Sequence, residues 1–446
     1  MFAKVLLNDL SLVLPTAWPS NHDRMYRLFL GTIFLLFFIG CASSKKGILN
    51  LKTEPLDSAF FQNQFTGFFA VDAASRDTLY NLNGQKYFTP ASNTKIFTLY
   101  TAMRFLPNRI PALKHLQKQD TLYIMGTGDP SLLHPHVKDT TVLRFLQNFK
   151  HVALNLNNLE DEKFGPGWAW GDYQYYYQPE VSPLPLYGNV VSIHGENPFI
   201  VRPDYFKDSV LPIRYSKRRE LERNLFYYAN GRRDTVEIPY RIDTTLTRIL
   251  LEDALGKKIR ITDRMPEGTK NILPGISADT LYRRMMHESD NLIAEQLLLL
   301  ASSTLSDTLS GQRVRDSILA GNLKDLKSPP RWVDGSGLSR YNLFTPESIV
   351  HVLSKMYAEI DRKRLFSLFP AGGESGTLED WYPGNPDPYL YAKTGSLSNN
   401  HCISGYLLTK SGKTVIFSFM NNHFRPPSSE VKKRMQRIFE RIRDTY

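Results

Sequence analysis

Alternating apolar and polar positions predict strands near both ends of the chain. Residues 65–88 (FTGFFAVDAASRDTLYNLNGQKYF) predict two strands joined by a polar turn at residues 74–77. Residues 402–422 (CISGYLLTKSGKTVIFSFMNN) predict a second hairpin that turns at residues 411–412. We therefore expect one antiparallel sheet that is assembled from both ends of the chain.

The C-terminal residues 428–446 have the apolar spacing of a helix. The apolar positions that recur on one face are Val431, Met435, Ile438, Phe439 and Ile442. Ser428 or Ser429 is expected to cap the N-terminus, because a serine hydroxyl can accept a hydrogen bond from the first turn. The pattern predicts an amphipathic helix.

Two internal segments also predict helices. Residues 278–302 (ADTLYRRMMHESDNLIAEQLLLLAS) predict one helix, capped by Ser277 or Asp279. An apolar helix begins within residues 92–95 (SNTK), after a loop in which Pro90 favours an extended chain. A small polar cluster therefore stands where an apolar helix starts.

Residues 107–270 have a different pattern, in which short strand-like runs alternate with turn clusters. The runs are 120–128 (DTLYIMGTG), 151–158 (HVALNLNN) and 189–195 (NVVSIHG). They predict a mostly β insertion that separates residues 44–106 from residues 271–446. Such an insertion is tolerable because the entropic cost of closing a loop grows only slowly with its length.

The composition is that of an ordered globular protein. The chain has 446 residues, of which 42% are hydrophobic and 22% charged, and it is long enough to bury a large core. The formal net charge is +11, but the basic residues are scattered among acids. This pattern argues against nucleic-acid binding and favours attraction to an anionic cell envelope.

The N-terminus predicts a signal segment over residues 1–40, with Met25 as an alternative start. Arg24 and Arg27 precede an apolar run at residues 28–40. This run is too short to span a bilayer, which needs about 20 residues, but it suits the apolar region of a signal peptide. We expect an exported protein in the periplasm or another extracytoplasmic part of the envelope.

Cys41 directly follows this run. The ending Phe38-Ile39-Gly40-Cys41 resembles a bacterial lipoprotein signal, with Phe38 where leucine is usual. It implies cleavage before Cys41 and a membrane anchor through a lipid on its thiol, whereas the alternative is an ordinary exported protein. Cys402 is then the only other cysteine, so no intramolecular disulfide is available, and we expect it in the core.

The pattern Ser-x-x-Lys occurs three times, at Ser43–Lys46, Ser92–Lys95 and Ser429–Lys432. Only Ser92 opens an apolar helix, and three residues later is almost one helical turn, so Ser92 and Lys95 project on the same side. A lysine whose pKa is lowered can take the proton of a serine nucleophile. The alternative is a serine cap beside a surface lysine.

Two further motifs favour the catalytic interpretation. They are Ser289-Asp290-Asn291 and Lys393-Thr394-Gly395. Serine-x-asparagine recurs at residues 398–400, so that motif has little weight alone. The three motifs in this order are the set found in penicillin-binding proteins and class A β-lactamases. Lys393 is expected to begin an edge strand that could pair with an extended peptide.

Four more blocks carry a resemblance to a known family. They are GTGDPSL (126–132), GWAWGDY (167–173), VDGSGLSR (333–340) and LFPAGGESGTL (368–378). With these blocks the chain resembles, from about residue 65 to 424, the class C low-molecular-mass penicillin-binding proteins (peptidase family S13), which are D-alanyl-D-alanine carboxypeptidases and endopeptidases. The resemblance implies an α+β fold, in which an antiparallel sheet flanked by helices forms a penicillin-recognising DD-peptidase domain.

The resemblance also implies roles for five residues. Ser92 is expected to be the nucleophile, with Lys95 as its base. Ser289 would relay the proton to the leaving D-alanine, and Asn291 would hold the substrate amide and Lys95. Lys393 would supply the positive potential that keeps Lys95 neutral.

Further residues are expected to bind the substrate. Thr394 would bond its terminal carboxylate, and the backbone N–H groups of Ser92 and Ser396 would form the oxyanion hole. Asp172 and Arg340 would contact the diamino acid of the substrate, with a surface acid and a turn arginine as the alternative interpretations.

The implied activity is a serine D-Ala-D-Ala carboxypeptidase acting on peptidoglycan stem peptides, with cleavage of D-alanyl cross-links left open and β-lactams as covalent inhibitors. Ser92 and Ser289 lie closer in the chain than the resemblance suggests, which predicts that an inserted subdomain is reduced or missing. The alternatives are a catalytically silent peptidoglycan-binding lipoprotein and a β-lactamase. A β-lactamase is disfavoured because no Glu-x-x-Leu-Asn segment lies between Ser289 and Lys393. No cofactor or metal is required, and residues 134–136 (HPH) are interpreted as a loop.

Overall fold

The computed structural model describes residues 59–196 and 198–446, so the signal segment and Cys41 lie outside the described residues. The α-helices are α2 Ala59–Gln62, α3 Thr94–Phe105, α4 Thr141–Gln147, α5 Thr244–Leu255, α6 Ala278–His287, α7 Asn291–Ser302, α8 Gly311–Ala320, α9 Pro346–Glu359, α10 Arg362–Ser367 and α11 Ser428–Thr445. The strands are β1 Phe65–Asp72, β2 Thr78–Leu82, β3 Arg109–Lys118, β4 Thr121–Gly126, β5 His151–Asn155, β6 Val190–His194, β7 Ile200–Arg202, β8 Val210–Leu211, β9 Phe226–Tyr227, β10 Val236–Pro239, β11 Arg260–Ile261, β12 Asn271–Ser277, β13 Leu390–Leu397, β14 Asn400–Leu408 and β15 Thr414–Asn422. None of the described helices has both the length and the apolar character needed to cross a bilayer.

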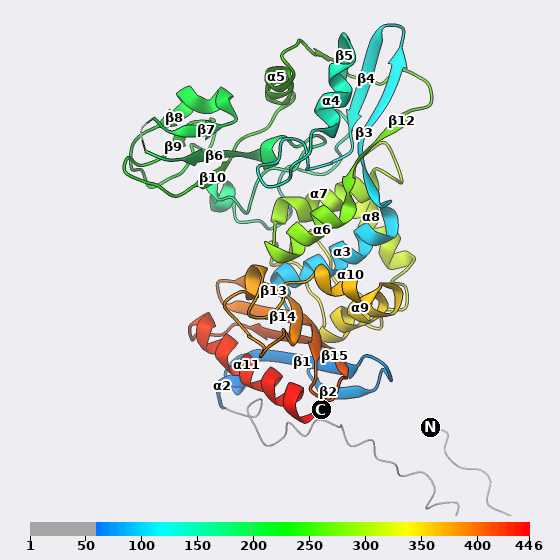
Figure 1. The fold of residues 1–446 in the computed structure, drawn as a ribbon, viewed down its shortest axis with the longest axis vertical. Coiled ribbons are helices and arrows are strands. Elements are labelled where there is room, and N and C mark those ends of the chain that lie inside the picture. Colours follow the sequence, from blue (N-terminus) through cyan, green and yellow to red (C-terminus); the bar gives the residue numbers. More distant parts are fainter. Residues whose placement is uncertain (1–58, 197) are drawn as a thin grey trace, which may run out of the picture. The chain divides into compact units, whose positions relative to one another are not determined.

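A five-stranded antiparallel sheet combines strands from both ends of the chain (Figure 1). Its strand order is β13-β14-β15-β1-β2, and β1 pairs along its whole length with β15. The predicted sheet is therefore confirmed. Cys402 lies on β14 with its side chain fully buried, as the sequence predicted.

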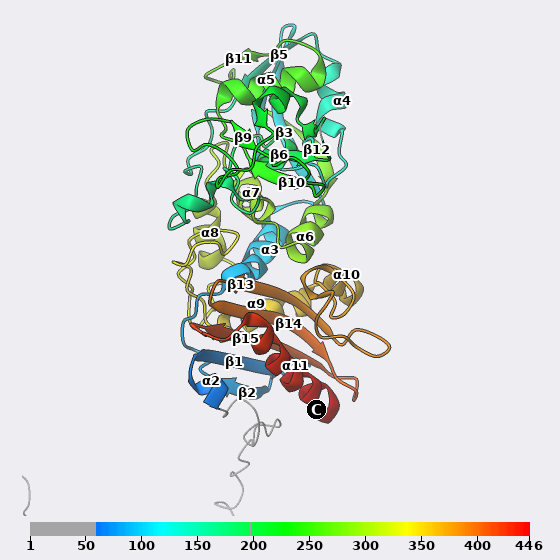
Figure 2. The ribbon, with the colours of Figure 1, turned by 90° about the vertical axis from the view of Figure 1, so that its left-hand side faces the viewer.

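Helices cover both faces of this sheet (Figures 1 and 2). Successive residues of β15 face opposite sides, as the pleat of a strand requires. Phe417 packs with the apolar residues of α11, whereas Ile416 packs with those of α3, α7 and α9. The sheet thus separates two apolar cores.

The C-terminal helix α11 has the predicted buried face. Its buried residues are Val431, Met435, Ile438, Phe439 and Ile442. The predicted cap was wrong, because Ser428 is already the first helical residue and Pro427 occupies the N-cap without a side-chain hydrogen bond. Docking on the sheet therefore stabilises this helix more than capping does.

The predicted single helix over residues 278–302 is two helices. The chain leaves α6 at Glu288, Ser289 has a left-handed φ of 56°, and Asp290 begins α7 by accepting a hydrogen bond from Ile293 N. Ser, Asp and Asn side chains compete with the helical backbone, which favours such a break. The break presents Ser289 at the junction of the two helices.

The inserted region contains a second sheet with the order β11-β5-β4-β3-β12. The three strand-like runs of the sequence each contain a strand, namely β4, β5 and β6. The region also contains α4 and α5, so it is less purely β than expected. Its strand β12 pairs with β3 but starts at Asn271, so this sheet continues past the predicted boundary at residue 270. A separate apolar core lies within the region.

We predict that Phe439→Ala destabilises the fold by about 3–5 kcal/mol. The Phe439 ring is fully buried and packs 4.7 Å from the ring of Phe417, so truncation leaves a cavity under α11. Denaturant unfolding of the two proteins measures the loss. Lys433→Ala, at an exposed position of the same helix, is the control, and an equal loss in both variants would contradict the packing shown here.

Candidate active site

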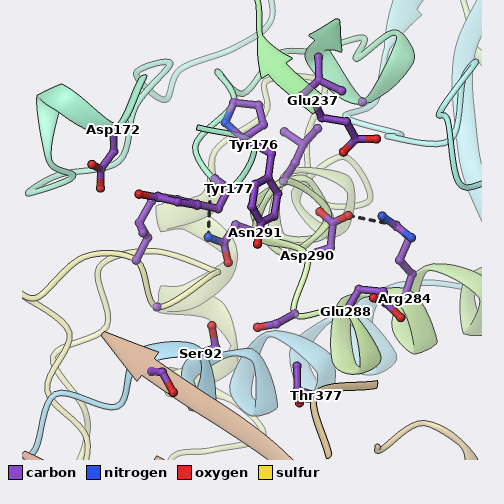
Figure 3. A pocket seen from close by; sticks show the side chains of 18 of the residues that line it. Ser92, Asp172, Tyr176, Tyr177, Glu237, Arg284, Glu288, Asp290, Asn291 and Thr377 are labelled. Carbon is purple, nitrogen blue, oxygen red and sulfur yellow. Dashed lines mark hydrogen bonds and ion pairs between the residues drawn. The ribbon is translucent and has the colours of Figure 1, made fainter. Parts of the chain in front are cut away.

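A cleft of about 880 Å³ lies where the inserted region meets the main sheet and its helices (Figure 3). Ser92 lies just before α3, Ser289 and Asn291 lie at the break between α6 and α7, and Ser396 lies on β13. The predicted site residues that line the cleft are Ser92, Asp172, Ser289, Asn291, Arg340 and Ser396. Segments more than 300 residues apart in the chain thus contribute to one cavity.

Lys95 lies beneath Ser92 and has no exposed surface. Its Nζ lies 3.0 Å from Ser92 Oγ and 2.6 Å from Asn291 Oδ1. It also donates to the backbone carbonyl of Ser336 at 2.7 Å. The geometry lets a neutral Lys95 accept the proton of Ser92 while Asn291 and Ser336 hold its position.

Asn93 ties the Ser92 turn to the edge of the main sheet. Ser92 lies in a 3₁₀ turn, Ala91–Asn93, and the buried Asn93 side chain donates to Lys393 O at 3.0 Å and accepts from Ser404 Oγ. Sequence analysis missed this role, although Asn93 follows Ser92 directly. This contact sets the distance between the Ser-x-x-Lys motif at Ser92 and the Lys-Thr-Gly motif at Lys393.

Gly395 makes this close approach possible. A Cβ at this position would lie 2.7 Å from Pro90 O and 2.8 Å from Ser92 N, where the backbone has no room to yield. The glycine of Lys-Thr-Gly is therefore a packing requirement, since a larger residue would push β13 away from Ser92.

Lys393 and Ser289 form the second contact pair of the site. The Nζ of Lys393 donates to Ser289 Oγ at 2.9 Å and to Thr394 O at 2.7 Å. β13 is an edge strand of the main sheet, as predicted. The expectation that Lys393 begins this strand was wrong, because β13 starts at Leu390.

Glu295 organises the loop that carries Ser336, and sequence analysis missed it. It lies about one helical turn after Asn291 on α7, and its carboxylate accepts from the N–H groups of Gly335 (2.8 Å) and Ser336 (2.7 Å). These bonds orient the Ser336 carbonyl toward Lys95. The spacing of Glu295 from Asn291 was the available signal, but the partner loop lies 40 residues away.

Burial lowers the pKa of both lysines. Loss of water lowers the pKa of Lys95 to about 8, although three carboxylates act in the opposite direction. These are Glu295, Asp334 and Asp290. Burial and then repulsion from Lys95 hold the pKa of Lys393 well below its usual value. The carboxylates thus oppose the lowering of the pKa of Lys95, whereas burial and Lys95 both act against a charge on Lys393, the residue to which the sequence analysis assigned the positive potential.

Thr394 and Ser396 present hydroxyl groups along β13. Thr394 Oγ1 donates to Thr377 Oγ1 at 2.7 Å, and Thr377 lines the cleft. Ser396 Oγ lies 2.9 Å from Nδ1 of His401, on the neighbouring strand. Burial lowers the pKa of His401 to about 3, so the imidazole is neutral. His401 was not recognised in the sequence, because only the strand register brings it to Ser396.

Asp172 and Arg340 line the cleft but do not contact each other. Asp172 lies in a short 3₁₀ helix, η3 (Trp170–Gln174), and in the view of Figure 3 it is on the opposite side from Arg284. Burial, followed by the charge of Asp172, raises the pKa of Tyr177 to about 12. Arg340 is exposed, and its Nη1 reaches Asn399 Oδ1 at 3.5 Å.

Tyr177 joins the inserted region to the Lys95 cluster. Its backbone carbonyl accepts from Asn291 Nδ2 at 2.9 Å, so Asn291 contacts Lys95 with one end of its amide and the inserted region with the other. The orientation of this amide is therefore set from both sides.

Comparisons with known proteins agree with this arrangement. A model of the D-Ala-D-Ala carboxypeptidase 3 (S13) family matches residues 51–211 and 248–442. D-alanyl-D-alanine carboxypeptidase DacB of Haemophilus influenzae is 22% identical over 92% of this chain and 96% of its own. Penicillin-sensitive carboxypeptidase A of Dictyostelium discoideum is 25% identical over 79% of this chain and 81% of its own.

Among solved structures, penicillin binding protein 4 (dacB) of Haemophilus influenzae has a TM-score of 0.69 at 18% identity. The match covers 89% of this chain and all of that one, which shows a shared α+β fold. The family match extends over most of the chain and includes all three motifs. The chain therefore belongs to the D-Ala-D-Ala carboxypeptidase 3 (S13) family and is a serine-type D-Ala-D-Ala carboxypeptidase.

Proposed function

We propose that Ser92 is the nucleophile of this carboxypeptidase and forms an acyl-enzyme with the penultimate D-alanine of a peptidoglycan stem peptide. The observation that carries the proposal is the position of the buried Lys95 Nζ, 3.0 Å from an Oγ that opens to the cleft. Lys95 takes the Ser92 proton as the Oγ–carbon bond forms. The bond to the terminal D-alanine then breaks, and water later releases the shortened peptide and restores Ser92.

Ser289 is proposed to carry the proton from Lys95 to the leaving amine. It lines the cleft beside Asn291, and its Oγ accepts from Lys393 at 2.9 Å. A hydroxyl that accepts from one group can donate its own proton to another, which suits a relay. Asn291 is proposed to hold both Lys95 and the substrate amide.

The terminal carboxylate of the substrate is proposed to bind beside Thr394 and Ser396. Its negative charge would raise the pKa of Lys393, and the charge gained by Lys393 would then lower the pKa of Lys95. Binding of the substrate would in this way produce the neutral base that attack requires. On this proposal, Lys393 gains the positive charge that the sequence analysis assigned to it only when the substrate is bound.

The backbone N–H groups of Ser92 and Ser396 are proposed to stabilise the oxyanion. The close approach at Gly395 supports this, because it brings β13 against the Ser92 turn. Removal of one such donor typically costs about 10²–10³ in rate. Asp172 and Arg340, which line the cleft, are proposed to contact the diamino acid side chain.

Action outside the cytoplasm follows from this substrate, since stem peptides belong to the cell wall. The solved relative from Haemophilus influenzae also has a structure complexed with a β-lactam. We propose β-lactams as covalent inhibitors here, a lipid on Cys41 as the anchor, and the cell envelope as the location.

We predict that labelled penicillin attaches covalently to the protein and that Ser92→Ala abolishes the label. Gel fluorescence measures it. Ser429→Ala is the matched control, because Ser429 heads another Ser-x-x-Lys pattern and should keep full labelling. Absence of label in the parent protein would favour a silent scaffold, and label retained in Ser92→Ala would place the nucleophile elsewhere. Rapid loss of label by hydrolysis would favour a β-lactamase.

We predict that the rate of penicillin acylation rises with pH with a midpoint near pH 8 and levels off above it, since only neutral Lys95 can accept the proton. Glu295→Gln should move the midpoint to lower pH, by up to about one unit, because the Glu295 charge raises the pKa of Lys95. The exposed Glu267→Gln is the control. An unmoved or raised midpoint in Glu295→Gln would count against Lys95 as the base.

We predict that Cys41→Ser releases the protein from the membrane fraction and prevents incorporation of labelled fatty acid. Cys402→Ser is the control, because the buried Cys402 should leave lipidation unchanged. Fractionation of cells that express the full chain measures this. Fatty-acid labelling that survives in Cys41→Ser would reject the anchor.

A further inference from the structure

A buried arginine lies behind the wall of the cleft. The side chain of Arg219 is 1% exposed. Burial lowers its pKa to about 10, which still leaves it charged at neutral pH. A charged group is costly to bury unless it has partners. Its Nη1 donates to the carbonyls of Glu220 (2.8 Å) and Leu221 (3.3 Å), and its Cζ lies 4.9 Å from the ring centre of Tyr173.

Arg219 belongs to a segment that the family model leaves unmatched. The matched residues end at 211 and resume at 248. We call residues 212–228, which lie within this gap, the strap. The strap contains β9, which pairs with β8. The family match therefore does not describe the strap.

The strap contacts η3 and the residue after it through four interactions. Tyr173 Oη donates to Arg219 O at 3.0 Å, and Arg219 lies over the Tyr173 ring. Arg218 N donates to Gln174 Oε1 at 2.8 Å, and the Arg218 guanidinium lies 5.0 Å from the Tyr175 ring centre. Both kinds of interaction depend on direction, so they fix the orientation of η3 relative to the strap as well as holding the two segments together.

Residues 170–177, the cleft wall, depend on such support. Tyr173 is the only buried residue of η3, and the neighbouring Trp170 is 77% exposed. A five-residue 3₁₀ helix with one buried side chain has no core of its own to hold it in place. The wall nevertheless presents Asp172, Tyr176 and Tyr177 to the cleft.

We propose that the strap positions the cleft wall for the diamino acid side chain of the substrate, with Arg219 as the central positioning residue. The proposal rests on the function proposed above. None of the described residues that line the cleft belongs to the strap, so its effect passes through the wall. Attack on a penicillin needs Ser92 and Lys95, whereas a stem peptide must also place its side chain against the wall.

The test compares three substrates with full-length protein and Arg219→Met, which keeps an apolar stem and loses the guanidinium. The substrates are a stem peptide with its diamino acid, the same peptide with alanine in that place, and labelled penicillin. We expect kcat/KM for the diamino acid peptide to fall about tenfold or more, mainly through KM, because small misplacements of positioning groups are costly. The rates with the other two substrates should fall clearly less, because among the described residues the wall reaches Lys95 only through the bond from Asn291 to Tyr177 O.

Further variants distinguish a loss of wall positioning from a loss of folding stability. Arg219→Lys keeps the charge without the planar stack and should give an intermediate loss. Arg218→Ala removes only the outer cation from Tyr175 and should show the same selectivity on a smaller scale, with an unchanged Tm. The exposed Arg233→Met is the matched control and should behave like the parent.

Equal losses on all three substrates, or no loss in Arg219→Met and Arg218→Ala, would overturn the proposal. Failure of the proposed function gives a different result, because the parent protein would then not react with penicillin at all.

Discussion

The burial of Lys95 is the constraint on which the rest of the site depends. An amine removed from water needs polar partners, and this one finds them in three parts of the chain: Ser92 on its own turn, Asn291 at the start of α7, and the Ser336 carbonyl. The same burial lowers its pKa into the range where a lysine can act as a base. One side chain therefore links the packing of the helices to the chemistry of the cleft.

The backbone is strained at two points of the site. Ala91 and Ser289 both have left-handed φ angles, of 49° and 56°, that side-chain-bearing residues seldom adopt. Each lies next to a residue that the site needs in one orientation. The buried Asn93 and the Asp290 cap hold the two turns in place, so the surrounding structure compensates for the strain.

The site has two parts. One part holds the residues that are proposed to perform the acyl transfer, and the other is the wall that is proposed to select the substrate. The main sheet and its helices hold two hydrogen-bonded pairs, which are Ser92 with Lys95 and Ser289 with Lys393. The inserted region supplies the wall with Asp172 and Tyr177, and it reaches the first part through the bond from Asn291 to Tyr177 O. Changes in the insertion can therefore alter the wall while the lysine cluster is retained.

The sequence by itself determined the features that depend on short-range pattern: the antiparallel sheet from both chain ends, the buried face of α11, and the three motifs whose order indicates a DD-peptidase. It did not reveal the break at Ser289, because a helical apolar spacing continues through that residue. Glu295, His401 and Arg219 were also invisible, since each acts on a partner that only the folded chain brings near. The lowered pKa of each lysine likewise follows from tertiary structure. The pKa of a buried amine depends on how much water and which charges surround it, and neither quantity is contained in the spacing of residues along a chain.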